Sequence, residues 1–457
     1  GGFRGGGGGG GGRGFGSGSS SSEILINGKR TAGKNNQTSG ILNRITADQV
    51  DYIQIIRGTS GELDVRGTGQ VVNIVTFEEV SASSLQYQIN ADHQDDGHTQ
   101  PGGDLSYTNR IGGLDLVLSA VAEPRYGHEE SKEDSVLGNL SPNDRVIEER
   151  TTRQTSYEYT ANLGYEFSDR TSARFNALYS QNDNPTEVER SATDFTEQPN
   201  VILNQFEDIP GNQDNWEIGG DFETFFDNGD RFKVLFVLNQ DNRDSIRERF
   251  DIFDDGSSDK NLFLKSGSVT EEEIVRSSYT MDIFTGQDIE FGAERAVTTL
   301  DSNLALGVLS ANGTPSPAFG GLVPIPVNNA NSTVEETRYE PFLIHNWIIN
   351  SRMSLESHVV YEYSEIEQKG DVYNKRDFDF IKPKVDFRYD ITPTLQLRGT
   401  VEKVVRQLRF SDFVAATDDQ DEDSNTFAGN ANLRQEWFWK YDFNAEYRLP
   451  NDAGVVD

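Results

Sequence analysis

The segment YEYTANLGYEFSDRTSARFNALY, residues 157–179, decides the fold of most of the chain. On both sides of the polar stretch 168–171, aromatic and aliphatic residues alternate with polar ones, which is typical of two β-strands joined by a tight turn. We expect about fourteen such strands between residues 80 and 457. The clearest repeats of the pattern lie at 216–226, 232–238, 355–363, 385–389, 395–401 and 443–449.

The connections between these strands favour a membrane barrel over a soluble β-sandwich, which also alternates apolar and polar residues. Many strands have about 10–13 residues, which suits a tilted membrane crossing. Tight turns are predicted at 168–171, 227–230, 350–352 and 390–394. They alternate with predicted long loops at 125–153, 183–214, 241–271, 299–333 and 411–434. Short turns at one end and long loops at the other are typical of outer-membrane barrels.

In such a barrel the apolar residues face lipid and the polar residues face the lumen. The predicted lumen face carries Glu158, Thr160, Asn162, Glu166, Arg174 and Asn176. A polar lumen suits the passage of a hydrophilic ligand.

The composition excludes several classes of function. The formal net charge of −34 argues against a nucleic-acid partner, because phosphate contacts need clustered Lys and Arg. The absence of cysteine excludes disulfides and a thiol nucleophile. No apolar run approaches the roughly 18 residues of a membrane helix. Because the sequence starts at Gly1 and stops at Asp457 in mid-pattern, we expect it to be a fragment of a longer protein.

No catalytic constellation is present, and we expect neither an enzyme nor a bound cofactor or metal. The five histidines show no His-Glu-x-x-His spacing. His93 and His98 lie near three aspartates, but a solvated turn is the preferred interpretation over a metal site. The acidic cluster at 418–423 lacks the glycine and glutamate positions of an EF-hand loop, so we expect a solvated loop there as well.

Residues 1–22 form a Gly/Ser-rich segment, GGFRGGGGGGGGRGFGSGSSSS, which is typical of a flexible linker. An RNA-binding segment would also contain Arg-Gly-Gly and Arg-Gly-Phe sequences, but the acidic remainder argues against that function. A phosphate-binding loop would end in Gly-Lys-Ser or Gly-Lys-Thr, which this segment lacks.

Residues 23–79 differ from the barrel pattern and predict a small α+β unit. We expect strands at 24–26, 50–56 and 71–75, a tight turn at Asn27-Gly28, and a short helix at 41–45. The stretch 24–76 resembles the distal half of the plug domain of TonB-dependent outer-membrane receptors. The residues that carry this resemblance are Asn27, Gly28, Lys29, Arg30, Arg57, Gly58, Gly67, Gly69 and Asn73. A partial resemblance to the same family continues at 429–436, GNANLRQE.

The resemblance implies a 22-stranded transmembrane β-barrel, incomplete here, with a small α+β plug in its lumen. Residues 1–22 would then be a Gly/Ser-rich segment that belongs either to the plug or to a linker, 23–79 the distal half of the plug, and 80–457 a partial barrel. The resemblance also implies that plug residue Arg57 pairs with barrel glutamates, and Glu436, Glu158 and Glu166 are the candidates. The alternative is a solvated Arg57 at the end of its strand.

The implied function is TonB-dependent active transport of a nutrient, with a ferric siderophore as the first expectation, across the bacterial outer membrane. The implied partners are a TonB-type energy-coupling protein of the inner membrane, acting through an N-terminal box that this sequence lacks, outer-membrane lipid and lipopolysaccharide, and a small nutrient ligand. No residue selects the ligand. Two alternatives remain: a receptor for oligosaccharide uptake or for signalling without iron, and a soluble all-β glycan-binding protein.

Overall fold

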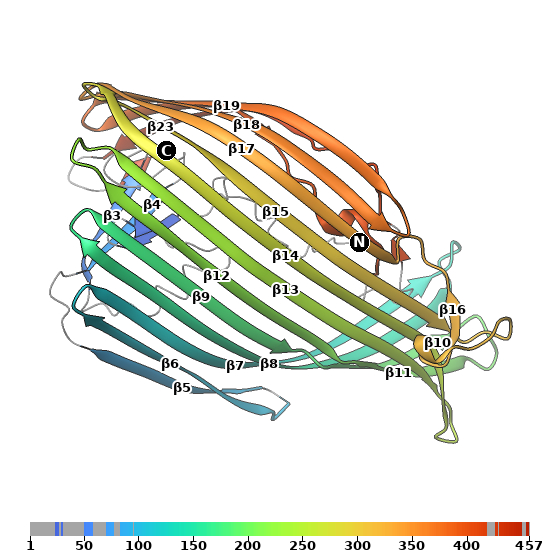
Figure 1. Cartoon of the computed structure of the whole chain (residues 1–457). Helices are drawn as coiled ribbons and strands as arrows, with labels where there is room; N and C mark the ends of the chain where they lie inside the picture. Colours follow the sequence, from blue (N-terminus) through green and yellow to red (C-terminus); the bar gives the residue numbers. More distant parts are fainter. Residues whose placement is uncertain are drawn as a thin grey trace.

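The computed structural model describes residues 23–26, 29–30, 50–57, 70–76, 83–94, 96–417, 426–427, 429–449 and 454–456. Nearly all of this part is antiparallel β-strand (Figure 1). Its helices are two short 3-10 turns, η2 (Pro317–Phe319) and η3 (Phe410–Phe413). Within the described residues, no helix is long and apolar enough to cross a membrane.

A four-stranded sheet near the N-terminus has the order β2-β1-β4-β3. Its strands are β1 (Glu23–Ile26), β2 (Lys29–Arg30), β3 (Val50–Arg57) and β4 (Gln70–Thr76). β1 runs antiparallel to β2 and parallel to β4. The strands predicted at 24–26, 50–56 and 71–75 are therefore confirmed. The predicted turn at 27–28 and the helix at 41–45 lie outside the described residues.

The main body is an eighteen-stranded sheet that forms a curved wall of tilted strands (Figure 1). Its strands are β5 (Ser84–His93), β6 (Thr99–Ile111), β7 (Leu114–Val136), β8 (Pro142–Ser168), β9 (Thr171–Asp183), β10 (Thr186–Asp194), β11 (Val201–Ile209), β12 (Gly211–Phe225), β13 (Arg231–Ile252), β14 (Ser258–Phe284), β15 (Gln287–Val308), β16 (Val323–Ile325), β17 (Asn331–Asn350), β18 (Met353–Gly370), β19 (Asn374–Thr392), β20 (Leu395–Val405), β23 (Trp437–Arg448) and β24 (Val455–Val456). Long neighbours along the chain pair antiparallel, and the order passes from β23 through β24 to β5. β21 (Ala416–Thr417) and β22 (Thr426–Phe427) form a separate small hairpin.

Two pairs of strands in this sheet continue one another across a proline. Pro185 separates β9 from β10, and Pro210 separates β11 from β12. Proline lacks the N–H group that a ladder position needs, so each strand is interrupted there without leaving the sheet. With each pair counted once and the short β16 and β24 left out, the described part contains fourteen long barrel strands. This count agrees with the number predicted.

The tight turns are where the sequence predicts them, but most of the predicted long loops are wrong. β8 and β9 meet at 168–171, and β17 and β18 meet at 350–353. In contrast, β7 and β8 pair through nearly all of 125–153, and β13 and β14 pair through most of 241–271. Polar residues there no longer alternate with apolar ones, yet their backbone groups still need partners, so the ladder continues.

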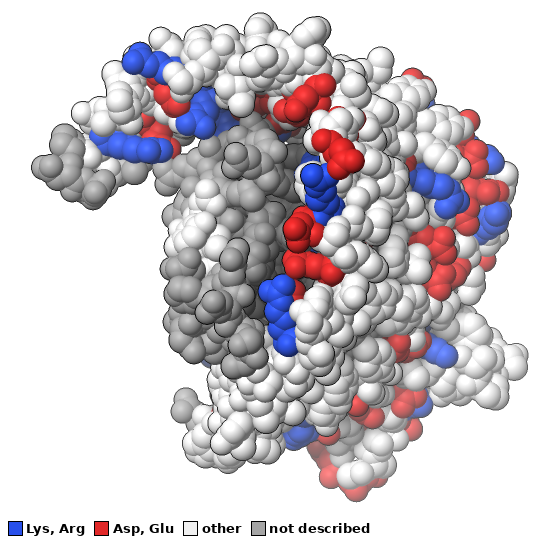
Figure 2. All heavy atoms as spheres, turned by 60° about the vertical axis from the view of Figure 1, so that its left-hand side comes forward, with Lys and Arg blue, Asp and Glu red and all other residues white. Residues whose placement is uncertain are grey.

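Side chains are distributed over the two faces in the opposite way to a soluble protein. Tyr159 and Phe175 are 51% and 38% exposed, whereas the adjacent Thr160 and Asn176 are 5% and 6% exposed. The same inversion recurs around the sheet, with Glu217, Glu294, Glu336 and Glu362 buried and many aromatic residues exposed. Figure 2 shows that charged side chains gather in patches and leave broad uncharged areas of outer surface. A polar interior and an apolar exterior suit a barrel wall in lipid and argue against a soluble sandwich.

Candidate functional site on the inner wall

Several strands are much longer than a membrane crossing requires. β8 and β14 have 27 residues each and β13 has 22, whereas roughly 9–11 residues cross a bilayer. Measured from the tight turns, the first part of each strand therefore forms the membrane band, and the remainder projects beyond it. We call this projecting part the extension. Because tight turns mark the periplasmic end of outer-membrane barrels, the extension lies on the outer side.

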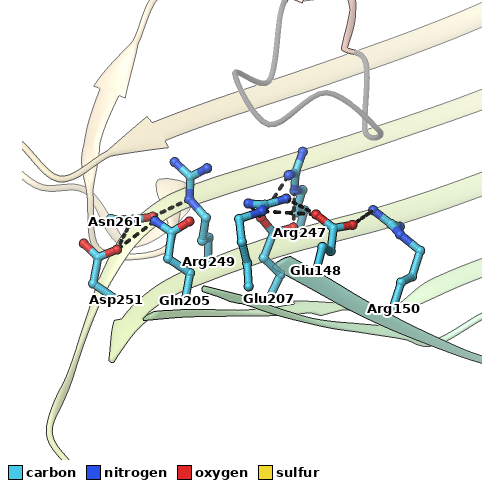
Figure 3. A network of polar contacts seen from close by, with 9 residues as sticks. Glu148, Arg150, Gln205, Glu207, Arg247, Arg249, Asp251 and Asn261 are labelled. Atoms are coloured by element: carbon cyan, nitrogen blue, oxygen red, sulfur yellow. Dashed lines mark hydrogen bonds and ion pairs between the residues drawn. The ribbon is translucent and has the colours of Figure 1, made fainter. Parts of the chain in front are cut away.

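A network of charged side chains occupies one face of the extension and crosses β8, β10, β11 and β13 (Figure 3). At its centre is Glu207, whose side chain is fully buried. Arg247 donates to it through Nε and Nη2 at 2.7 and 2.9 Å, which is a two-point guanidinium–carboxylate pair. Arg190 donates to Glu207 through Nη1 at 3.1 Å, and to Glu148 through Nε and Nη2 at 3.1 and 2.6 Å. We call these residues, with Arg150 and Arg249, the arginine network.

The outer end of the arginine network is built on amide side chains. Arg249 donates Nε to the Oδ1 atom of Asn261 at 2.9 Å. Asn261 and Gln205 in turn donate to one oxygen of Asp251, at 2.6 and 2.9 Å. In Figure 3 the guanidinium group of Arg249 points away from the sheet.

Burial and charge act against each other in this network. Burial raises the pKa of Glu207, but the hydrogen bond from Arg247 and the positive charges of Arg247 and Arg190 outweigh it and hold that pKa below its usual range. Burial lowers the pKa of Arg249, and the two neighbouring arginines add to this effect against the attraction of Glu207. Arginine nevertheless stays charged. The network thus holds four guanidinium groups and, with Asp251, three carboxylates.

A second network, which we call the lumen network, lies in the membrane band on β14, β15, β17, β18 and β19. Lys382 bridges two carboxylates, Glu340 and Glu362, with its Nζ atom 2.7 Å from Glu362. Arg338 lies 3.1 Å from Glu340 and 3.7 Å from Glu294. Arg276 also approaches Glu294, at 3.9 Å. Buried Glu336, two residues from Arg338 on β17, adds a fourth carboxylate to these three cations.

The segment around η3 folds inward onto this wall. Gln407 and Gln435 both donate to Glu362, at 3.3 and 3.2 Å. Phe410 and Phe413 pack in an apolar cluster on the inner wall. The other members of that cluster are Leu300, Val334, Ile366 and Val414. The segment is therefore attached to the barrel by both polar and apolar contacts.

The structure describes only part of the predicted plug–barrel site. Glu436 is exposed and pairs with Arg406 at 2.9 Å, and Glu166 pairs with Arg110 at 3.2 Å. Glu158 is half-buried on β8. The side chain of Arg57 lies outside the described residues, so its pairing with any of these glutamates stays a prediction. Asn27, Gly28, Gly58, Gly67 and Gly69 also lie outside them, and Lys29, Arg30 and Asn73 are placed by their backbone alone, on β2 and β4.

The histidines near residue 95 make local contacts. Nδ1 of His93 lies 2.7 Å from Oγ1 of Thr99, and the ring of His98 stacks on Tyr126 at 4.2 Å. In the part of the chain that the structure describes, no group of three or more Asp, Glu or His side chains could hold a metal ion. Asp95 and residues 418–425 lie outside that part.

The sequence did not reveal the arginine network, because its members lie in three segments that were predicted as loops. Glu207 and Arg247 are 40 residues apart, and Arg190 and Glu148 are 42 residues apart. One signal was available: Arg247, Arg249 and Asp251 alternate with Glu248 and Phe250. This spacing of two places the three charged residues on one face of a strand.

Comparison with known proteins adds information on the fold. No family model and no curated protein matches the chain. Among solved structures, a copper transporter, OprC, matches with a TM-score of 0.50 and 13% identity over 93% of this chain and 61% of that one. The alcaligin outer-membrane receptor FauA of Bordetella pertussis matches at 0.46 and 11%, covering 94% and 59%. The hemophore receptor HasR of Serratia marcescens matches at 0.48 and 13%, covering 94% and 62%.

The chain spans about three fifths of the length of these structures. At such low identity the likeness concerns the fold alone, and among these three structures the match to the copper transporter supports it. Many of the similar structures are TonB-dependent outer-membrane receptors, which are transporters and receptors, not enzymes. The prediction of an all-β transmembrane barrel is thus confirmed, and the protein has the barrel fold of TonB-dependent outer-membrane receptors.

Proposed function

We propose that the protein takes up a nutrient across the bacterial outer membrane, with energy from a TonB-type partner and without covalent chemistry. The observation that carries this proposal is the inner wall. Charged networks and an inward-folded segment line the interior of a barrel whose exterior is apolar. A wall of this kind suits a hydrophilic ligand and a displaceable plug.

Ferric siderophores are the first choice of ligand. Among the similar structures, one receptor is named for alcaligin, one is a hemophore receptor in complex with its hemophore and heme, and OprC is a copper transporter. Oligosaccharide uptake and signalling without transport are the alternatives.

Energised uptake in cells tests this proposal. A strain that lacks the full-length protein should lose accumulation of its radiolabelled ferric siderophore, and the complemented strain should regain it. A protonophore should abolish the complemented uptake, because the inner membrane supplies the energy. A rise in the outer-membrane abundance of the protein on iron starvation should accompany these effects. Unchanged iron uptake in the deletion strain would redirect the proposal to an oligosaccharide, and absence from the outer membrane would overturn it.

We further propose that residues 23–79 form the distal half of a plug within the barrel, with Arg57 paired to a barrel glutamate. An arginine–carboxylate pair in contact with water is geometrically specific but weak, which suits a plug that must be released. Replacing Arg57 with Ala should therefore make the plug more sensitive to protease and alter transport. Unchanged sensitivity together with unchanged transport would contradict the pairing.

A further inference from the structure

The arginine network has an excess of positive charge in a strongly acidic protein. The whole chain carries 75 acidic and 41 basic residues, and the lumen network has one more carboxylate than cations. The arginine network has the opposite charge balance, because its four guanidinium groups outnumber its three carboxylates. The overall field of such a chain repels anions, so an anion would be retained only where cations are concentrated.

The arginine network also contains a buried donor without a partner. Arg247 is 2% exposed and uses Nε and Nη2 on Glu207, while its Nη1 atom has no hydrogen-bond partner among the described residues. A buried charged donor that lacks an acceptor is costly, because it has lost water and gained nothing in return. An acceptor on a bound ligand would remove that cost.

Arg249 offers a second position for an anion on the same strand. It lies two residues from Arg247 on β13 and donates Nε to a neutral amide. Its guanidinium points away from the sheet (Figure 3), and burial disfavours its charge, as the lowered pKa shows. A bound anion would add to the attraction of Glu207 and Asp251, which already favours that charge. Planar guanidinium groups match the geometry of carboxylates, so two arginines on one strand suit a ligand with several carboxylates.

We propose that the arginine network binds a multiply charged, carboxylate-bearing anion at the outer end of the barrel. This inference deepens the proposed uptake function, since it names the ligand as an anionic chelate. A ligand that arrives from outside meets the extension before it meets the membrane band. Glu207 and Glu148 fix Arg247 and Arg190 in place, so the site is organised before the ligand arrives.

The test measures binding of ferric citrate to the purified full-length receptor in detergent, followed by quenching of tryptophan fluorescence. Arg249→Gln is the first variant, because it removes a positive charge and leaves both hydrogen bonds between Arg247 and Glu207 in place. Lys260→Gln is the matched control. It removes the same charge from neighbouring β14, where Lys260 pairs with Glu248 at 2.6 Å, and Glu248 faces opposite to Arg247 and Arg249 on β13.

We expect Arg249→Gln to weaken ferric citrate binding about tenfold, which corresponds to the loss of one charged hydrogen bond. Lys260→Gln should bind as the wild type does, and all three proteins should show the same heat-induced shift in electrophoretic mobility. The wild-type affinity should fall with salt, since the attraction is electrostatic. Equal affinity of the two variants, or no saturable binding to the wild type, would overturn the site and leave the network as a structural tie between strands.

Binding and uptake separate this inference from the proposed function. Selective loss of ferric citrate binding in Arg249→Gln supports the site even if cells show no energised uptake, in which case the transport proposal fails alone. Energised uptake of ferrioxamine B, a cationic chelate, that proceeds equally in the wild type and Arg249→Gln, without ferric citrate binding, would uphold transport and overturn the site.

Discussion

The membrane band and the extension are built from the same strands, but their outer faces differ. In the band, Phe175 is exposed on the outside and Asn176 is buried on the inside. In the extension, Lys260 and Glu248 pair on the outside, while Glu207 and Arg247 pair on the inside. The inner face carries buried charged pairs in both regions, so the two regions differ in what the outer face meets, which is lipid in one region and water in the other.

The two regions also use their buried charges differently. In the lumen network a lysine stands between two carboxylates, Glu340 and Glu362, and side chains of the segment around η3 reach the same place. In the arginine network one carboxylate, Glu207, stands between two arginines. The band thus has an acidic excess, which suits cationic plug residues, and the extension has a basic excess.

Removal of Arg247 should have the largest effect on stability. Arg247→Ala leaves Glu207 fully buried with Arg190 as its remaining arginine partner, and loss of a partner from a buried ion pair costs about 3 kcal/mol. Urea unfolding of the refolded protein in lipid vesicles, followed by tryptophan fluorescence, measures this loss. Arg243→Ala on the same strand is the control, because its side chain is 64% exposed and its pair with Asp241 should contribute little. Equal losses in the two variants would show that the network is not a tie between strands.

A lysine on the outer face should distinguish the band from the extension. Phe175→Lys places a charge toward lipid and should lower the free energy of unfolding by about 2–4 kcal/mol. Ile202→Lys replaces an apolar, exposed residue near the tip of β11, on the face opposite to Gln205 and Glu207, where the outer face meets water, and should change stability by less than about 0.5 kcal/mol. The same unfolding assay in vesicles applies. A similar cost at both positions would place the boundary of the membrane elsewhere.

The sequence could predict the band because lipid imposes a pattern on it. Tyr157, Tyr159 and Tyr165 alternate with polar residues since one face must be apolar along the whole crossing. The turn at 168–171 could be predicted for the same reason, because it ends that pattern on both sides.

The extension and the arginine network could not be predicted, since water on both faces leaves no requirement for apolar residues. Residues 125–153 therefore resemble a loop in composition, although most of them are paired. Arg190 meets Glu148 because β10 pairs with β8 in a register that places the two residues opposite each other. That register cannot be predicted from a single sequence. The segment around η3 was missed because its contacts with the wall are tertiary.

Acidification should have the smallest of the three effects on the free energy of unfolding, and it should act on the extension through Glu207. Its folded pKa lies below its usual value because Arg247 and Arg190 outweigh the effect of burial. A depressed folded pKa contributes stability that is present above the unfolded pKa and is lost as pH falls through the folded value. Unfolding measured between neutral and acidic pH should show this loss in the wild type. The Glu207→Gln variant should be less stable than the wild type at neutral pH. Its free energy of unfolding should fall less than that of the wild type as the pH is lowered.

Asp255 provides the matched control for this pH dependence. Its pKa is also lowered, by hydrogen bonds from Ser257, but it is exposed in the turn between β13 and β14. Solvent screens that contribution, so Asp255→Asn should leave the pH dependence of unfolding close to that of the wild type. If the free energy of unfolding of Glu207→Gln fell with pH as steeply as that of the wild type, the groups responsible for the acid response would lie outside the arginine network. The buried pair of Glu207 and Arg247 would then contribute geometry to the anion site without contributing to the acid response.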